Sequence, residues 1–411
     1  MPNSERKAFN ASALNTLELP NYRNSTEVVS GITVEDIVKA CLIGRLNLFL
    51  IGETGEGKTQ LENDILSLFG NNGFFEQGRN DITIKEMFTR LNLEKLRTAK
   101  TTDDVKEITG HIDHPVYVVD ELTRCIPAVQ NQFFNLFDGF ITVDGRKYTL
   151  GKNGYSIGIA SGNVGNGRYV GTSETDRALL DRMHVILDVD YFPKTPTDTL
   201  EVLARKRDPR VSDATAEDKI ETVVQLHKDF QTLQPTLLQY AAALYFVHAL
   251  DYLENVPGNS KRKNKNSWPG IVAGRAIGSD EAVIFPFSTR AAISTLTLAK
   301  ALEAIRAAKD MKYADSIEPV FDAAYLIGAQ SGILNPAAVD TGYNSNPYTA
   351  MQAVIDGIRT EFAAKKEALQ HAIGSAVQKG ALAGTDDFTN RWAYMVDILS
   401  QTAQQVKEGR K

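Results

Sequence analysis

The hydrophobic pattern changes character near the middle of the chain. Between Thr33 and about Asp190, short apolar runs alternate with helix-like stretches, and four of these runs are apolar along their length: 46–51, 116–119, 155–160 and 184–189. Strands that are apolar on both sides are typical of a parallel sheet covered by helices on both faces. The pattern therefore predicts an α/β domain built on a parallel sheet.

The second half shows helical spacing instead. Pro193 and Pro196 interrupt the chain, and apolar residues then recur three or four positions apart: Ile220, Val223, Val224, Phe230, then Ile293, Leu296, Leu302, then Met351, Val354, Ile355, Ile358, Phe362. The final helix carries such a seam at Phe388, Trp392, Met395, Leu399 and Val406, which we expect to pack within the same chain. We predict an N-terminal arm at 1–26, an α/β core at 27–192, a helical domain at 193–340 and a C-terminal helical extension at 341–411.

Composition excludes several classes of protein. Lys and Arg total 45 and Asp and Glu total 51, a net charge of −6, so bulk charge does not favour a nucleic-acid or membrane surface. Two cysteines are too few for a disulfide framework. The N-terminus lacks the apolar stretch of a signal peptide, and no apolar run is long enough for a bilayer. We expect a soluble cytoplasmic protein without a membrane partner.

A phosphate-binding loop follows the first apolar run. The sequence GETGEGKT at 52–59 fits GxxxxGK[ST] and stands between a predicted strand and an amphipathic stretch. Glycines let backbone N–H groups surround a phosphate, Lys58 bridges the β- and γ-phosphates, and Thr59 offers a hydroxyl to Mg²⁺. We predict ATP and Mg²⁺ as ligands and the following nucleotide-binding residues: Gly52, Glu53, Thr54, Gly55, Glu56, Gly57, Lys58, Thr59 and Gln60.

The next two strands carry polar residues at their ends. Asp120 and Glu121 end the run 116–119, and we expect Asp120 to hold Mg²⁺ with Thr59 while Glu121 polarises the attacking water. Asn163 follows the run 155–160, where its amide is suited to contact the γ-phosphate or that water. Two adjacent carboxylates at the end of a buried strand need a cation or water to satisfy them.

Other charged segments are weaker signals. Isolated arginines are usually surface residues, so Arg182, Arg177 and Arg290 gain weight only from their order after the motifs above. His111 and His114 suggest a metal site, but a third ligand is not evident, and a turn before the next strand is the favoured interpretation. The segment 255–278, with KRKNKN at 261–266, is predicted to be an exposed loop.

Taken in order, these motifs resemble the Walker A, Walker B, sensor 1, arginine-finger and sensor 2 elements of an AAA+ ATPase. More narrowly they resemble the MoxR family, whose relatives activate Rubisco and nitric oxide reductase. The supporting segments are DELTR at 120–124, a hairpin at 140–148, LDRM at 180–183 and STRA at 288–291, with a helix-2 insertion expected within 71–113. Asp-Gly at 144–145, between alternating apolar residues, independently indicates a type I′ turn. The resemblance implies a five-stranded parallel sheet followed by an all-α lid.

The resemblance also implies a function. It implies a Mg²⁺-dependent ATPase that forms a ring, commonly a hexamer, in which Arg182 completes the neighbour's site; Arg177 remains the alternative finger. Arg290 on the lid would sense the γ-phosphate, and the work of hydrolysis would remodel a client protein, with a von Willebrand A-domain protein as a partner. GTP in place of ATP stays open.

Two rival functions follow from the same residues. Arg146 and Lys147 at the hairpin, with the loop at 261–266, would line a basic pore in a nucleic-acid translocase or helicase-like motor. The acidic net charge argues against that alternative. A nucleotide-gated scaffold that hydrolyses slowly is the third hypothesis, and the presence of Glu121 argues against it.

Overall fold

The computed structural model describes residues 10–19, 26–97, 105–163, 177–204, 218–249 and 283–379, and three positions near the C-terminus, 396, 398 and 399. Most of the predicted N-terminal arm, the 255–278 loop and most of the last helix lie outside the described residues, although Leu399 of that helix is buried. The chain divides into two compact units: residues 1–232 with 304–309, and residues 233–303 with 310–411.

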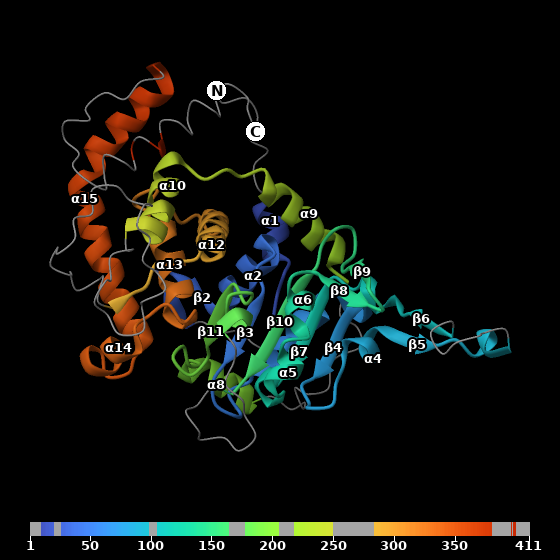
Figure 1. Cartoon of the computed structure of the whole chain (residues 1–411). Helices are drawn as coiled ribbons and strands as arrows, with labels where there is room; N and C mark the ends of the chain where they lie inside the picture. Colours follow the sequence, from blue (N-terminus) through green and yellow to red (C-terminus); the bar gives the residue numbers. More distant parts are fainter. Residues whose placement is uncertain are drawn as a thin grey trace. The chain divides into compact units, whose positions relative to one another are not determined.

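A five-stranded parallel sheet forms the centre of the first unit, in the order β11-β3-β10-β7-β4 (Figure 1). Its strands are β3 (Leu48–Ile51), β4 (Gly73–Gln77), β7 (Val116–Asp120), β10 (Ile157–Gly162) and β11 (Val185–Asp188). The register places Ile51 beside Gly162 and Asp188, and Gln77 beside Asp120. The carboxyl ends of all five strands therefore meet at one edge. The predicted α/β fold with a five-stranded parallel sheet is confirmed.

The apolar pattern predicts four of these strands and misses β4. This strand is less covered than the others, including β11 at the other end of the sheet: Phe74 is buried while Phe75 is 43 % exposed. An edge strand with alternating exposure leaves no continuous apolar run in the sequence. The range 71–113 predicted for an insertion thus begins with a strand of the sheet.

Helices surround this sheet and join its strands. Phe49, Tyr117, Phe133 and Met183 belong to one buried cluster on the sheet, and α2 packs against α9. The helices of the first unit are α1 (Ala11–Asn15), α2 (Val34–Gly44), α3 (Lys58–Ser67), α4 (Ile84–Phe88), α5 (Pro127–Gln130), α6 (Phe133–Phe137), α7 (Arg177–Leu180), α8 (Pro196–Ala204) and α9 (Ile220–Gln231).

Three antiparallel hairpins complete the first unit. They pair β1 (Glu27–Val29) with β2 (Ile32–Thr33), β5 (Thr89–Leu91) with β6 (Lys106–Ile108), and β8 (Phe140–Val143) with β9 (Arg146–Thr149). At the β8–β9 turn, Asp144 has φ 49° and Gly145 has φ 75°, so both central residues are left-handed, as a type I′ turn requires. The Asp-Gly prediction is confirmed. The β5–β6 hairpin projects away from the sheet (Figure 1).

The second unit is helical in its described part. Its helices are α10 (Leu237–Leu244), which continues into a π-helical turn at Tyr245–Ala249, α12 (Thr289–Ala308), of which residues 304–308 belong to the first unit, α13 (Glu318–Gln330), α14 (Pro336–Gly342) and α15 (Pro347–Lys379). On α15 the five predicted core residues 351, 354, 355, 358 and 362 are all buried. No helix within the described ranges combines the length and apolarity that a bilayer crossing needs.

The predicted stripe on α12 is partly wrong. Ile293 is 62 % exposed, whereas Leu302 is fully buried. The buried face also contains Thr295, Leu298 and Ala299, which are at most 1 % exposed. Small residues such as Thr295 and Ala299 allow close packing but contribute little to an apolar pattern. The predicted buried face of α12 is therefore rotated by about one residue from the observed one.

Candidate nucleotide-binding site

The loop between β3 and α3 has the backbone of a phosphate cradle. Gly52, Gly55 and Gly57 have φ of 147°, 94° and 86°, a region that side chains rarely adopt. A Cβ at Gly52 would lie 2.6 Å from Val189 Cγ2. Gly57 caps α3 without a side chain. The first N–H groups of α3 therefore have no capping side chain, and such a helix N-terminus favours an anion.

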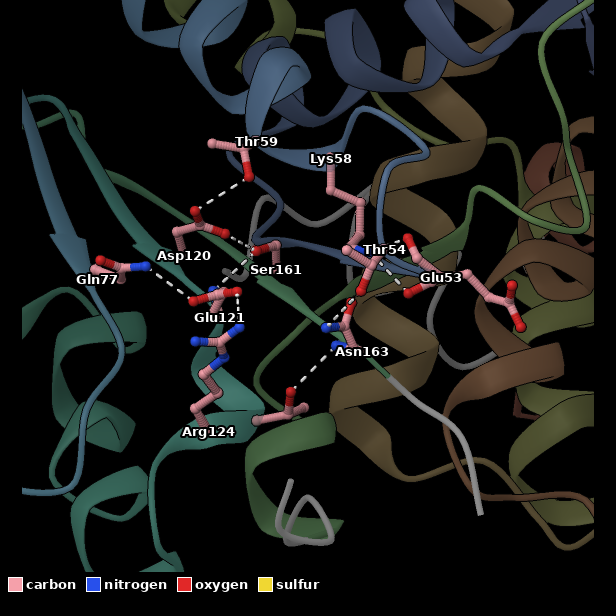
Figure 2. A network of polar contacts seen from close by, with 12 residues as sticks. Glu53, Thr54, Lys58, Thr59, Gln77, Asp120, Glu121, Arg124, Ser161 and Asn163 are labelled. Atoms are coloured by element: carbon pink, nitrogen blue, oxygen red, sulfur yellow. Dashed lines mark hydrogen bonds and ion pairs between the residues drawn. The ribbon is translucent and has the colours of Figure 1, made fainter. Parts of the chain in front are cut away.

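Lys58 places its ammonium group back over this loop. Its Nζ donates hydrogen bonds of 2.8 Å to Gly52 O and 2.7 Å to Glu53 O (Figure 2). Burial lowers the pKa of Lys58, while nearby carboxylates, Asp190 first, act in the opposite direction. The cation is thus positioned at the loop that would receive a phosphate, with backbone carbonyls as its partners.

Two residues after β11 hold the loop from outside, and the sequence interpretation missed both. Asp190 Oδ2 accepts a 2.7 Å hydrogen bond from Glu53 N, and burial raises the pKa of Asp190. Lys194 Nζ donates 2.7 Å to Glu56 O and lies 3.5 Å from the Glu56 carboxylate. The available signal was position: both residues follow a strand predicted to lie in the same sheet.

The structure brings the two predicted metal ligands together. Thr59 Oγ1 donates a 3.1 Å hydrogen bond to Asp120 Oδ2, and the Ser161 hydroxyl donates to Asp120 Oδ1 (Figure 2). Ser161 also accepts from Glu121 N at 3.0 Å. Ser161, which the sequence interpretation did not single out, thus links the ends of β7 and β10.

Both carboxylate oxygens of Glu121 are held. Oε2 accepts a 2.9 Å hydrogen bond from Gln77 Nε2, and Oε1 lies 2.6 Å from an Arg124 guanidinium nitrogen (Figure 2). The residue itself has φ 56°, in the left-handed region, so the chain turns sharply as β7 ends. Gln77, the last residue of β4, is a second site residue that the sequence did not reveal, because β4 itself was missed.

Asn163 and Gln60 point in different directions. The Asn163 amide nitrogen lies 3.5 Å from Thr54 Oγ1 of the loop, and its backbone N–H donates to Thr123 Oγ1 at 3.1 Å. Asn163 is therefore on the loop side, as its predicted role requires (Figure 2). Gln60 donates at 3.1 Å to Asp64 of its own helix, so its side chain does not point into the cradle.

A further acidic residue tests whether a divalent cation fits this site. Glu62 of α3 is fully buried, and neither of its carboxylate oxygens has a hydrogen-bond partner among the described residues. Burial, and next the charge of Asp120, raise the pKa of Glu62 well above its ordinary range. Carboxylate and hydroxyl oxygens short of positive charge are the donors that Mg²⁺ prefers, so this donor set fits the ion.

Arg182 lies at the opposite edge of the sheet. Its Nε is 3.0 Å from Asp138 Oδ2, and its guanidinium stacks 4.7 Å from the Phe134 ring centre. Asn47, just before β3, donates at 2.9 Å to Arg182 O. The length of β3 separates that edge from Gly52 by roughly 15 Å, so Arg182 lies away from the loop of its own chain.

The other predicted residues are located as follows. Arg290 lies in the first turn of α12, in the second unit. Arg177 begins α7, and its side chain is outside the described part. His114 Nδ1 lies 2.6 Å from Asn72 O and its Nε2 lies 3.2 Å from His111 Nδ1. In the described part of the chain, three or more His, Cys, Asp or Glu side chains nowhere gather as a metal site.

Residues 47–183 match the family model of the AAA domain, dynein-related subfamily. The match begins just before β3 and includes the loop at 52–59, Asp120, Glu121 and Asn163. These residues form an AAA domain, a module that binds nucleotide and whose general activity is ATP hydrolysis. No protein of the curated set matches the sequence.

Among solved structures, the fold is similar to that of a "putative ATPase" from Cytophaga hutchinsonii. The two share 16 % identity with a TM-score of 0.60, over 85 % of this chain and 96 % of the other. At this identity the likeness shows the fold. Because it covers most of the chain, the shared fold includes helices beyond residues 47–183. Neither comparison is with a protein described as a MoxR ATPase, so that narrower resemblance stays a prediction.

Proposed function

We propose that this protein is a Mg²⁺-dependent ATPase of the ring-forming AAA+ type that uses hydrolysis to remodel a partner protein. The observation that carries the proposal is the meeting of five predicted groups at one edge of the sheet: Lys58, Thr59, Asp120, Glu121 and Asn163. They come from the carboxyl ends of two neighbouring strands, β7 and β10, and from α3. These are the parts that phosphoryl transfer to water needs.

Each group has a distinct role in this proposal. Lys58 leaves the loop carbonyls for the β- and γ-phosphates, and the glycine backbone surrounds the β-phosphate. Thr59 and Asp120 would hold the magnesium ion, which would neutralise charge on the phosphate oxygens. Asn163 hydrogen-bonds the attacking water, and Glu121, once released from Gln77, accepts its proton. Arg290 reports the γ-phosphate from the helical unit.

The position of Arg182 supports action between subunits. An arginine at the edge opposite to its own loop reaches a γ-phosphate only in another subunit. It must then exchange Asp138 for phosphate, a more highly charged partner. A ring, proposed as a hexamer, gives every site such an arginine.

Assembly and mixing of variants test this proposal. A non-hydrolysable ATP analogue should convert monomer into a ring in sedimentation, and an unchanged monomer would refute the ring. Arg182→Ala and Lys58→Ala should each be inactive alone but regain part of the activity when mixed, because a mixed interface pairs an intact loop with an intact arginine. Rescue of Arg177→Ala instead would assign the finger to Arg177.

The hairpin β8–β9 bears on the choice between a protein and a nucleic-acid substrate. Arg146 and Lys147 are exposed there, but Lys147 lies 3.9 Å over the Phe140 ring, and Asp144 at the turn pairs with Lys85. Part of the positive charge at this hairpin is thus engaged by local partners, which favours a protein client over nucleic acid. The family resemblance implies a von Willebrand A-domain protein as a further partner. The nucleic-acid translocase remains the alternative.

An ATPase assay distinguishes the two substrates. DNA or RNA, titrated at low and high salt, should leave turnover unchanged; a several-fold activation that falls with salt would favour the translocase. Replacing Arg146 and Lys147 together by Ala should spare basal turnover, since neither side chain contacts the nucleotide site in the structure.

A further inference from the structure

Glu62 is a buried carboxylate that the roles above leave without a function. It lies on α3, one turn after Thr59, and is fully buried. Positions three apart share one face of a helix, so Thr59 and Glu62 both face β7 and β10. Burial acts on Glu62 most strongly, followed by the Asp120 carboxylate, the Ser161 hydroxyl and the Lys58 ammonium group. Its own two oxygens have no hydrogen-bond partner among the described residues.

Around Glu62 the negative charge of Asp120 outweighs the positive charge of Lys58. Asp120 is also buried, at 6 % exposure, so two carboxylates share a small volume. The cation close to them, Lys58, directs its Nζ to two backbone carbonyls instead. Burying a carboxylate is unfavourable unless a cation or hydrogen bonds compensate it. Ser161 and Lys58 act on Glu62 in this sense, but the Ser161 hydroxyl donates to Asp120 and Lys58 donates to the loop, so burial outweighs both.

Two explanations meet this requirement, and they differ in charge. In one, Glu62 is a neutral acid inside the domain and needs only a polar neighbour. In the other, a divalent cation supplies the missing charge to Glu62 and Asp120 together. A neutral Glu62 would share its proton with Asp120, which acts on it directly, whereas the second explanation also accounts for the Thr59 hydroxyl that meets Asp120 at the same place.

We propose that Glu62 is the second carboxylate of the magnesium site and holds the hydrated ion together with Thr59 and Asp120. This rests on the proposed ATPase function. Mg²⁺ keeps several waters and takes one or two carboxylates in nucleotide sites, so a carboxylate behind Asp120 acts through those waters. The consequence is a site with an affinity for divalent cation even before nucleotide binds.

Mn²⁺ binding to the full-length chain, followed by the loss of the free-ion EPR signal, tests the proposal. Glu62→Gln keeps the shape and removes the charge, and should weaken Mn²⁺ binding roughly tenfold or more, the range for groups that support a metal ligand. Asp64→Asn is the matched control: Asp64 is buried on the same helix but accepts from Gln60. It should stay within about twofold of the wild type, since it does not support the metal.

Thermal unfolding gives a second readout that does not depend on the variant's activity. Without nucleotide, Mg²⁺ should raise the unfolding temperature of the wild type relative to EDTA, and should raise that of Glu62→Gln much less. No rise in the wild type, or equal Mn²⁺ affinity in Glu62→Gln, would overturn the proposal and make Glu62 a neutral acid. Failure of the ATPase proposal looks different: the wild type would then bind nucleotide no better than Lys58→Ala.

Discussion

The two edges of the central sheet both bury polar side chains but satisfy them differently. At the amino edge, Asn47 donates at 2.7 Å to Phe137 O and 2.9 Å to Arg182 O, and accepts at 2.8 Å from Gly158 N. At the carboxyl edge, Glu62 has no described partner and Lys58 turns to its own loop. Native proteins pair nearly all buried polar groups. The complete set of hydrogen bonds made by Asn47 therefore indicates a structural role. The missing partners at the carboxyl edge indicate a place where a ligand would bind.

The largest effects should come from the carboxyl edge. Lys58→Ala should abolish measurable nucleotide binding, because it removes the ground-state contact with phosphate, whereas Glu121→Gln should retain binding and lose roughly 10²- to 10⁴-fold in turnover, the usual contribution of a general base. Calorimetry and a phosphate-release assay measure the two quantities. Lys39→Ala, which removes an ammonium paired with Glu35 on α2, is the control. An equal loss of affinity in both site variants would contradict the division of roles.

Asn47→Ala tests the amino edge. It removes the Asn47 partner of three backbone groups, two of them in buried hydrogen bonds, and should lower the free energy of unfolding by about 2–4 kcal/mol, while nucleotide affinity stays unchanged. Chemical denaturation measures the first and calorimetry the second. Asn80→Ala is the control, since exposed Asn80 accepts one hydrogen bond, from Ile126 N at 2.9 Å. If Asn47→Ala lowered nucleotide affinity but not the free energy of unfolding, the amino edge would not have the purely structural role described here.

Gln77→Ala should have a smaller effect of opposite sign. Glu121 would lose one of its two partners and become free to orient the attacking water, so basal hydrolysis should rise roughly three- to tenfold, the factor that one hydrogen bond is worth. Gln225→Ala on α9, which removes a similar 2.8 Å bond to Asp229 far from the site, should leave the rate unchanged. A fall in the rate of Gln77→Ala would mean that Gln77 positions Glu121 rather than restrains it.

The smallest effect should be a pH dependence at the amino edge. Burial lowers the pKa of His114 from its ordinary 6.5, with His111, Asp113 and Lys152 as the charged neighbours. A lowered pKa means that the fold prefers neutral His114, so this stability is present above 6.5 and is lost as the pH falls through the folded value. The unfolding temperature of the wild type should fall on acidification more than that of His114→Gln. Equal slopes would contradict the assignment.

The hydrogen bonds of His114 explain the expected direction. Asn72 O can only accept, so Nδ1 carries the proton and Nε2 accepts from His111 Nδ1. A second proton on His114 would leave two N–H groups facing each other.

The features that could be predicted from the sequence are those that a local pattern or a short motif determines. The P-loop, the acids after β7 and the I′ turn each depend on neighbouring residues, so their positions could be read directly. β4 could not, because it is only partly buried and so leaves no continuous apolar run. Because β4 was not predicted, Gln77 at its end was missed as well. Asp190 and Ser161 bind other site residues only because their strands lie next to β3 and β7 in the sheet, and the order of the strands was not known from the sequence. Glu62 was missed because a glutamate inside an amphipathic helix gives no sign of being buried.

The place of β4 at the edge of the sheet has a consequence for the timing of catalysis. β4 pairs with β7 alone in the described sheet, and elements with few partners open locally at a lower free energy than central ones. Gln77 is its last residue, so each transient opening of β4 frees one oxygen of Glu121. The rate of amide hydrogen exchange along 73–77 would then change in parallel with the rate of basal hydrolysis. A client protein that stabilised β4 would slow hydrolysis without contacting the nucleotide.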